Sequence, residues 1–261
     1  MSRFNVLPVM DDRFAFGCRK EGNEMTQDEM KVMMQKPEIQ EMMAAFFESS
    51  GRQRHLEMRR HYRLRNRYAQ KGQILFVGSS LMENFPVNEF QQTLEKRHVI
   101  YNRGIGGYVM QDLLESMDEC IFELEPSKVF INIGTNDISR QEYRLEKLLA
   151  DYKEILVRIR ERLPDCQIHV MAYYPINATA DFPGVDPDQK ADMYRFRTNR
   201  NIQEANRAIE QLAGKLGLVF INVNHGLMDE QGDLKAEYAI EGLHLWPDAY
   251  AVILQNLKEY L

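Results

Sequence analysis

Residues 73–81 read Gln-Ile-Leu-Phe-Val-Gly-Ser-Ser-Leu, a run of apolar residues that stops at Gly78 and is followed by two serines. A short apolar run bounded by a glycine is typical of a strand that is buried on both faces of a sheet. The serines fall where this strand gives way to a turn. The stretch therefore predicts a buried strand that presents a hydroxyl group at its carboxyl end.

The pattern of a short apolar run recurs downstream, with helical stretches in between. Further strands are predicted at residues 98–101, 128–133, 167–172 and 218–221. Helices are predicted through residues 113–121, 145–163 and about 195–216, and after Pro247. Strands that alternate with helices indicate a parallel sheet covered on both faces. Ligands of such sheets bind beyond the carboxyl ends of the strands, so the chemistry is expected there.

The chain divides near residue 72. Residues 1–72 are helical in pattern and rich in methionine, whereas residues 73–261 carry the strand and helix alternation. Thr26 and Glu29 resemble a capping box that opens a helix, and Pro37 breaks or restarts that helix. We therefore expect a helical N-terminal extension of residues 1–72 and an α/β domain of residues 73–261.

The extension ends in a strongly basic stretch. Ser50-Gly51 predicts the end of the helix, and residues 52–71 contain seven arginines, at positions 52, 54, 59, 60, 63, 65 and 67. An anionic partner is one interpretation. A solvated helix face that pairs with acidic neighbours is the interpretation we favour. The apolar residues of the extension could pack on the sheet or on a second chain, so a homodimer stays open.

Composition narrows the class of protein. The chain has 44% hydrophobic and 28% charged residues and a net charge of −6, which gives no support to nucleic-acid binding. Its three cysteines, Cys18, Cys120 and Cys166, lack the spacing of a disulfide framework or a zinc site. The N-terminus shows no secretory pattern and no stretch suited to stable membrane insertion. We expect a protein of the cytoplasm.

Four segments carry polar residues where chemistry is expected. They are residues 78–81, 102–107, 134–137 and 241–244, and the first three each follow a predicted strand. Each segment alone is weak evidence, because Gly-Ser-Ser, glycine-rich turns and Asn-Asp pairs are common turn sequences. Their combination and order are much harder to explain by chance.

These segments resemble the conserved blocks of the SGNH/GDSL hydrolase family. The blocks read ILFVGSSLMENFPV (74–87), YNRGIGG (101–107), VFINIGTNDIS (129–139) and EGLHLWPDAY (241–250). The sequences of these blocks are similar to those of bacterial relatives of platelet-activating-factor acetylhydrolase. The resemblance implies a three-layer α/β/α sandwich with a flavodoxin-like, five-stranded parallel sheet. It also implies a serine esterase that needs no cofactor and no metal.

The resemblance also implies roles for individual residues. Ser80 would be the nucleophile, His244 its base and Glu241 the acid that orients the imidazole. The oxyanion hole would use the backbone N–H of Ser80, the backbone N–H of Gly107 and the Asn136 amide. Asn102 and Asp137 would support the site.

Two positions depart from the family pattern. Ser79 stands where the family has aspartate, and Glu241 stands where the family has a shorter acid. These departures motivate an alternative, a non-catalytic ligand-binding module that keeps the fold. A flavodoxin-like phosphate or flavin binder, with residues 78–80 cradling a phosphate, explains neither Asn136 nor His244.

The substrate is less defined than the reaction. We expect a small-molecule ester, with an acetyl or short acyl group on a carbohydrate or a lipid. Met82, Tyr108, Tyr174 and Trp246 flank the blocks and are either pocket walls or core residues. Residues 177–190 read as a polar surface loop that could shape specificity.

Overall fold

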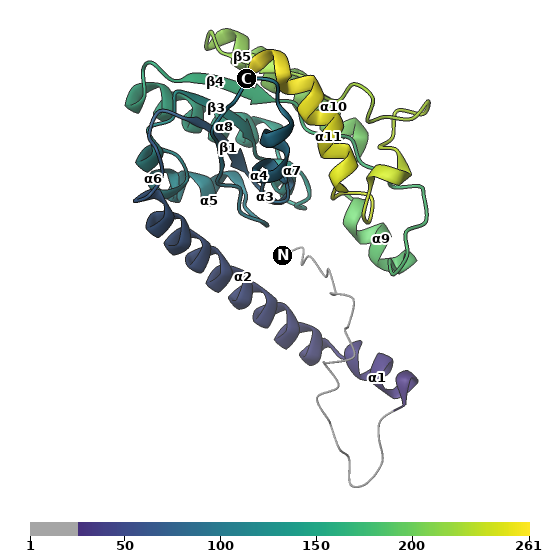
Figure 1. The fold of residues 1–261 in the computed structure, drawn as a ribbon. Coiled ribbons are helices and arrows are strands. Elements are labelled where there is room, and N and C mark those ends of the chain that lie inside the picture. The colour runs from purple at the N-terminus through teal and green to yellow at the C-terminus, as the bar shows by residue number, and fades with distance from the viewer. Residues whose placement is uncertain (1–25) are drawn as a thin grey trace. The chain divides into compact units, whose positions relative to one another are not determined.

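A computed structural model describes residues 26–261, and five parallel strands form its central sheet (Figure 1). The strands are β1 (Ile74–Gly78), β2 (Ile100–Asn102), β3 (Lys128–Asn132), β4 (Gln167–Met171) and β5 (Val219–Ile221). Their order across the sheet is β2-β1-β3-β4-β5. This is the flavodoxin-like order, so the predicted fold class is confirmed.

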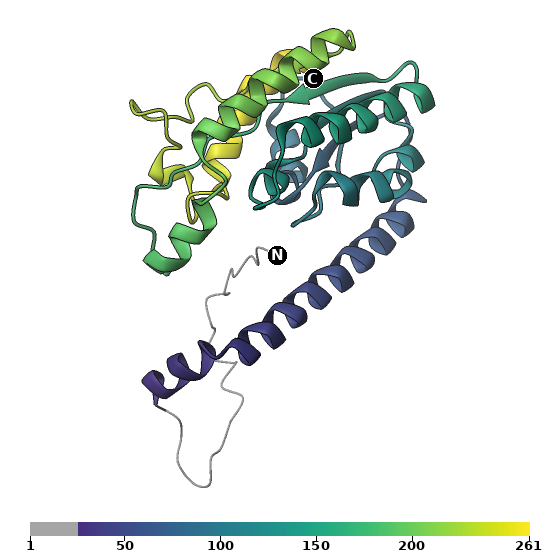
Figure 2. The same ribbon diagram turned by 180° about the vertical axis from the view of Figure 1, so that it is seen from behind.

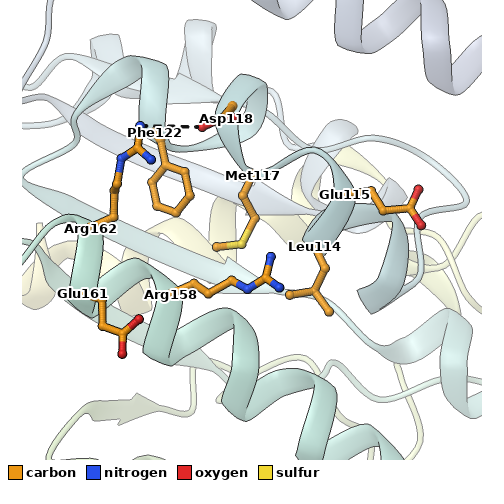
Figure 3. A pocket seen from close by; sticks show the side chains of 8 residues that line it. All are labelled: Leu114, Glu115, Met117, Asp118, Phe122, Arg158, Glu161 and Arg162. Atoms are coloured by element: carbon orange, nitrogen blue, oxygen red, sulfur yellow. Dashed lines mark ion pairs between the residues drawn. The ribbon is translucent and has the colours of Figure 1, made fainter.

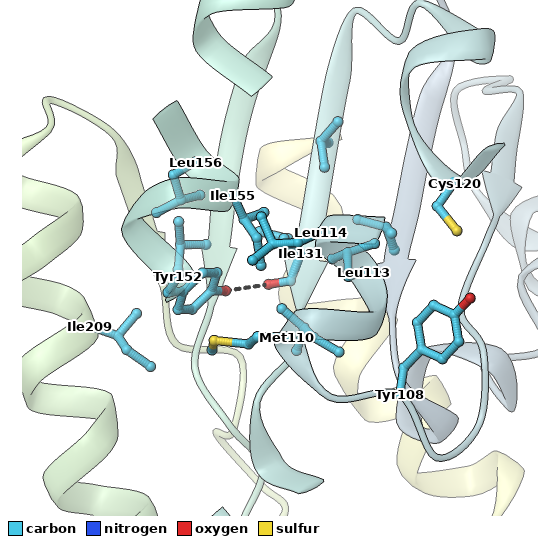
Figure 4. Close-up of a cluster of buried hydrophobic side chains, with 14 of the residues drawn as sticks. Tyr108, Met110, Leu113, Leu114, Cys120, Ile131, Tyr152, Ile155, Leu156 and Ile209 are labelled. Atoms are coloured by element: carbon cyan, nitrogen blue, oxygen red, sulfur yellow. Dashed lines mark hydrogen bonds between the residues drawn. The ribbon is translucent and has the colours of Figure 1, made fainter. Parts of the chain in front are cut away.

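Strand β1 is buried on both sides because its side chains alternate between two cores. Leu75 and Val77 belong to one cluster, and Ile74 and Phe76 belong to the other. Figure 4 shows the first cluster, where the Tyr152 hydroxyl donates a hydrogen bond to the Ile131 carbonyl oxygen at 3.3 Å. Residues 74–77 are apolar without alternation because both faces of the sheet are covered.

Helices cover both faces of the sheet, as Figures 1 and 2 show from opposite sides. The first face is packed by α5 (Met110–Glu115), α6 (Met117–Cys120), α8 (Leu145–Arg162) and α10 (Asn199–Lys215). The second is packed by α3 (Ser80–Glu83), α4 (Val87–Phe90) and α11 (Pro247–Leu257). The remaining elements of this region are α7 (Thr135–Ile138), α9 (Pro187–Tyr194), η2 (Gln91–Thr93), η3 (Phe122–Leu124), η4 (Ala236–Tyr238) and η5 (Lys258–Tyr260).

Three helix boundaries differ from the sequence-based expectation. The helix expected through 113–121 is interrupted at Ser116, whose hydroxyl donates to the Asp112 carbonyl oxygen at 2.8 Å. Helix α10 begins later than residue 195, because Thr198 is extended and its hydroxyl accepts the Asn201 N–H. The segment 177–190, expected to be a loop, contains the start of α9.

In the extension, α1 spans Gln27–Met34 and α2 spans Pro37–Asn66. The capping box is confirmed, since the Thr26 N–H donates to the Glu29 carboxylate at 2.9 Å and the Glu29 N–H to the Thr26 hydroxyl at 3.3 Å. The predicted end at Ser50-Gly51 is wrong, because α2 continues through it. An internal glycine costs a helix only about 1 kcal/mol, and the Glu48–Arg52 ion pair spans this point.

The described residues fall into two compact units, one that ends at Leu56 and one that spans Glu57–Leu261. The division expected at residue 72 stays a prediction. Within the second unit, the end of α2 pairs with acidic neighbours: Arg59 lies 3.4 Å from the Glu119 carboxylate, and Arg63 also forms an ion pair with it. These pairs agree with the solvated, acid-paired interpretation of the basic stretch.

Between residues 26 and 261, every helix is too short or too polar to cross a bilayer. The expected cytoplasmic location stays a prediction, and the N-terminal segment on which it partly rests lies outside the described residues. Cys120 and Cys166 are free thiols, and Cys18 lies outside the described residues as well.

Candidate active site

Ser80 lies at the carboxyl end of β1, where it is the first residue of α3 and Ser79 is the N-cap. The sheet order reverses between β1 and β3, so the segments that follow these two strands diverge there and leave room for a ligand. Ser80 is half-buried, whereas Ser79 is fully buried and its hydroxyl has no hydrogen-bond partner in the described part of the chain. Of the two adjacent serines, only Ser80 faces a site that a substrate can reach.

His244 joins Ser80 to Glu241 in one hydrogen-bonded chain. The His244 Nε2 atom lies 2.9 Å from the Ser80 Oγ atom, and Nδ1 is in contact with the Glu241 Oε1 atom. A carboxylate can only accept, so Nδ1 carries the proton and Nε2 is left to accept from the serine hydroxyl. The three residues that the sequence analysis named are thus brought together.

Glu241 is held by more than the imidazole. Its Oε1 atom also accepts the backbone N–H of His244 at 3.3 Å, and its carbonyl oxygen accepts a hydrogen bond from the Tyr194 hydroxyl. Asn177 donates its N–H to the next carbonyl, that of Gly242, at 2.9 Å. The longer acid therefore reaches the imidazole from a fixed backbone, and the residue type at this position does not interrupt the chain.

A tight turn from Gly104 to Gly107 follows β2. A Cβ atom at Gly104 would lie 2.3 Å from the Glu83 backbone nitrogen, so only glycine allows the turn to pack against α3. Gly107 is exposed and has a φ of 81°, which glycine adopts without strain. The two glycines therefore serve different ends, close packing at Gly104 and backbone geometry at Gly107.

Nearly all backbone donors around this turn are used. Five of them make hydrogen bonds of 2.7–3.2 Å. The pairs are Arg103 to the Phe76 carbonyl, Gly104 to Asn102 Oδ1, Ile105 to the Gly78 carbonyl, Gly106 to Glu83 Oε2, and Tyr108 to the Ile105 carbonyl. Within residues 26–261, the N–H groups of Gly107 and Ser80 donate to no protein acceptor. The Ser80 N–H is free because it belongs to the first residue of α3, and the Gly107 N–H is free because it lies at an exposed turn position. Both are among the donors expected for the oxyanion hole.

Asn136 lies in α7, directly after β3. Its amide nitrogen donates one hydrogen to the Tyr108 carbonyl oxygen at 2.9 Å. An amide has two N–H donors, so one remains for a ligand while the other holds the side chain in place. The bond also ties the segment after β3 to the end of the 104–107 turn.

Asn102 and Asp137, which are expected to support the site, form hydrogen bonds with backbone groups. Asn102 accepts the Gly104 N–H at 2.9 Å, and its amide donates to the carbonyl oxygens of Met82 and Phe85, so it links the turn to α3. Asp137 accepts the N–H of Met110 at 3.2 Å and thereby holds the start of α5. Neither residue touches the Ser80–His244–Glu241 chain, and their role in supporting the site stays a prediction.

A family model described as GDSL-like lipase/acylhydrolase matches residues 76–252, more than half of the 261-residue chain. The chain belongs to the GDSL-like lipase/acylhydrolase family. It is an enzyme of the carboxylic ester hydrolase class.

Several proteins are similar to this GDSL-like hydrolase. One is a structure from Streptococcus pneumonia described as a platelet activating factor, which is 29% identical. The two structures align with a TM-score of 0.75 over 84% of this chain and 98% of that one. An acetylxylan esterase from Geobacillus stearothermophilus shares the fold, with 18% identity and a TM-score of 0.54 over 73% of this chain and 94% of that one.

A curated relative, the N-acylneuraminate cytidylyltransferase of Escherichia coli, is 24% identical over 196 residues. The match covers 75% of this GDSL-like hydrolase and 42% of the relative. The chain therefore spans less than half of the length of that relative.

Two residues near the site were missed by sequence analysis. Glu83 accepts the Gly106 N–H at 2.7 Å, beside the free N–H of Gly107. Arg197 is buried, and its Nε and Nη2 atoms have no hydrogen-bond partner in the described part of the chain. Burial lowers the pKa of Arg197 to about 10, and the nearby Glu241 carboxylate opposes that shift. Sequence periodicity does not single out Glu83 or Arg197, because the environment of each is made by residues that are distant in the sequence.

Asp137 offers a test by pH. Burial raises the pKa of this carboxyl group from 3.8 to about 6. A raised folded-state pKa means that its contribution to stability is present at low pH and is lost as pH rises toward 6. We expect Asp137→Asn to gain stability relative to the parent between pH 4.5 and pH 7.5, as measured by urea unfolding at both values. A difference that does not change with pH would contradict this.

Other candidates are corrected by the structure. Met82, Tyr108 and Tyr174 are almost completely buried in the two cores, so they are not pocket walls, whereas Trp246 is 48% exposed.

A hollow of about 420 Å³ lies between α5, α6 and the end of α8, lined by residues such as Arg158 and Arg162 (Figure 3). These segments lead into the amino ends of the strands, so the hollow lies away from Ser80. Residues 26–261 contain no cluster of three or more candidate metal ligands.

Proposed function

We propose that this enzyme cleaves a small acyl ester through an acyl-enzyme intermediate on Ser80. The hydrogen-bonded chain from Ser80 through His244 to Glu241 carries the proposal. The Ser80 oxygen attacks the ester carbonyl carbon as its proton passes to the His244 Nε2 atom. The imidazolium then gives that proton to the leaving alcohol, and water repeats the cycle to release the acid. Glu241 holds the imidazole tautomer and stabilises its charge.

The oxyanion of each tetrahedral intermediate binds the N–H groups of Ser80 and Gly107 and the free amide hydrogen of Asn136. These donors are fixed before the substrate binds, so they need no reorganisation when charge develops on the oxygen. The alternative of a non-catalytic binding module would leave the aligned serine, histidine and glutamate without a purpose.

An acetyl or short acyl group on a carbohydrate is the substrate class that we favour, with a lipid alcohol as the alternative. Support comes from the names of relatives, since an acetylxylan esterase and an N-acylneuraminate cytidylyltransferase both concern sugars. The platelet activating factor description supports the lipid alternative. A panel of esters that varies acyl length on a sugar and on a glycerol alcohol would separate the two.

Covalent labelling tests the nucleophile directly. A fluorophosphonate probe should form an adduct on Ser80 of the full-length protein, located by peptide mass spectrometry, because phosphonylation needs an activated serine. Heat-unfolded protein is the control. A folded protein that turns over p-nitrophenyl acetate yet carries its adduct on another residue would refute the assignment.

Removing the Asn136 amide should slow the reaction without preventing substrate binding. We expect Asn136→Ala to lower kcat roughly 10²–10³-fold with little change in KM, because the lost donor acts mainly on the transition state. The exposed Asn88 on α4 provides a matched control, and Asn88→Ala should keep full activity. A large rise in KM at constant kcat would instead assign Asn136 to ground-state binding.

A further inference from the structure

The turn that carries the Gly107 N–H is held from outside the family domain. Helix α2 ends at Asn66, before the region that the family model matches. The Tyr62 hydroxyl on this helix donates a hydrogen bond to the Gly104 carbonyl oxygen at 2.5 Å. Tyr62 is 3% exposed, so water does not compete for this bond. Gly104 is the first residue of the turn and is fixed to α2 by it.

A second contact secures the same piece of chain. The Arg103 Nε atom donates to the Asn66 side-chain oxygen at 2.9 Å, and the Arg103 guanidinium lies 4.9 Å from the centre of the Tyr62 ring. Its Nη1 atom donates to the Asn102 carbonyl oxygen at 2.8 Å. Tyr62 and Asn66 are four residues apart, on one face of α2, and together they hold Arg103 and Gly104, where the chain enters the turn.

Asn66 is itself anchored to the domain. Its amide nitrogen donates to the Glu119 carbonyl oxygen and to the Glu123 carboxylate, both at 2.8 Å. The end of α2 is therefore fixed on α6 and η3 on one side, and on the Arg103 side chain and the Gly104 carbonyl on the other.

We propose that Tyr62 is a positioning residue for the oxyanion hole, acting through the Gly104 carbonyl on the direction of the Gly107 N–H. The proposal rests on the proposed function, because it assigns a role within the same site. Gly107 has no side chain that could hold its peptide in place, so the turn geometry alone sets its N–H direction. The Gly104 N–H, the Gly106 N–H and the Gly104 carbonyl are held by Asn102, Glu83 and Tyr62 respectively.

Tyr62→Phe in the full-length chain tests the proposal, since it removes the hydroxyl and keeps the ring. We expect kcat for p-nitrophenyl acetate to fall about tenfold with KM nearly unchanged, in line with the loss of one buried hydrogen bond. A trifluoromethyl ketone, which forms a tetrahedral adduct, should bind more weakly by a similar factor. Tyr68→Phe is the matched control, because this tyrosine follows α2 and its side chain is 90% exposed.

The outcomes separate the proposal from its premises. A stable Tyr62→Phe protein with parental kcat and parental affinity for the ketone would overturn the proposal while leaving the esterase assignment intact. An inactive parent that no fluorophosphonate labels would overturn the proposed function instead. Should Tyr62→Phe not fold, Asn66→Ala releases the Arg103 guanidinium that packs on the Tyr62 ring. A smaller joint loss of kcat and ketone affinity is then expected, and parental values for both would overturn the proposal.

Discussion

Replacing Ser80 with alanine should abolish ester hydrolysis, with kcat for p-nitrophenyl acetate falling at least about 10⁴-fold. The loss follows because the Ser80 oxygen is the only hydroxyl in hydrogen-bond contact with the His244 Nε2 atom among the described residues. The residual rate would come from the oxyanion donors, which stay in place. Initial-rate kinetics on purified protein, with circular dichroism to verify folding, measure the effect.

Ser79 provides the matched control, one residue away. Its hydroxyl is buried without a partner and does not cap α3, so Ser79→Ala removes an unsatisfied polar group and no contact of the site. Activity and stability of Ser79→Ala should match or exceed those of the parent. Loss of activity in Ser79→Ala with retention in Ser80→Ala would reverse the assignment of the nucleophile.

Replacing Glu241 with glutamine should lower kcat by about 10³–10⁴-fold, the second-largest effect that we expect. A glutamine amide can present its nitrogen to the imidazole and so favour the tautomer in which Nε2 carries the proton. That tautomer cannot accept the Ser80 proton, and the neutral amide no longer stabilises the imidazolium. Steady-state kinetics, with the geometry verified by a crystal structure of the variant, measure the effect.

Two further variants refine this result. Glu237→Gln, on the exposed η4 segment, changes the same side chain outside the site and should leave kcat unchanged. Glu241→Asp restores the acid that the family usually has but shortens the reach to Nδ1, so its kcat should fall between those of the parent and Glu241→Gln. Parental activity in Glu241→Gln would show that another group orients His244.

The positions of β1, β3 and β4 could be predicted because burial on both faces leaves a visible run of apolar residues. The turns after β1, β2 and β3 could be predicted because glycines and small polar residues lie within a few positions of each strand end. The boundaries of the helices were harder to predict from the sequence. Ser50-Gly51 looked like an end, yet α2 continues because one weak residue pair does not outweigh its neighbours in a long helix.

The sequence by itself determined the parallel sheet, because alternating strand and helix patterns leave few other arrangements. The four segments taken together, through their resemblance to a family, predicted Ser80, His244, Gly107 and Asn136 as site residues. Only the tertiary structure decided which groups hold them. Ser80 and His244 are in contact although they are 164 residues apart in the sequence, and Tyr62 and Gly104 are 42 residues apart. Buried contacts of this kind leave no local pattern, because their stability depends on the exclusion of water by the rest of the fold.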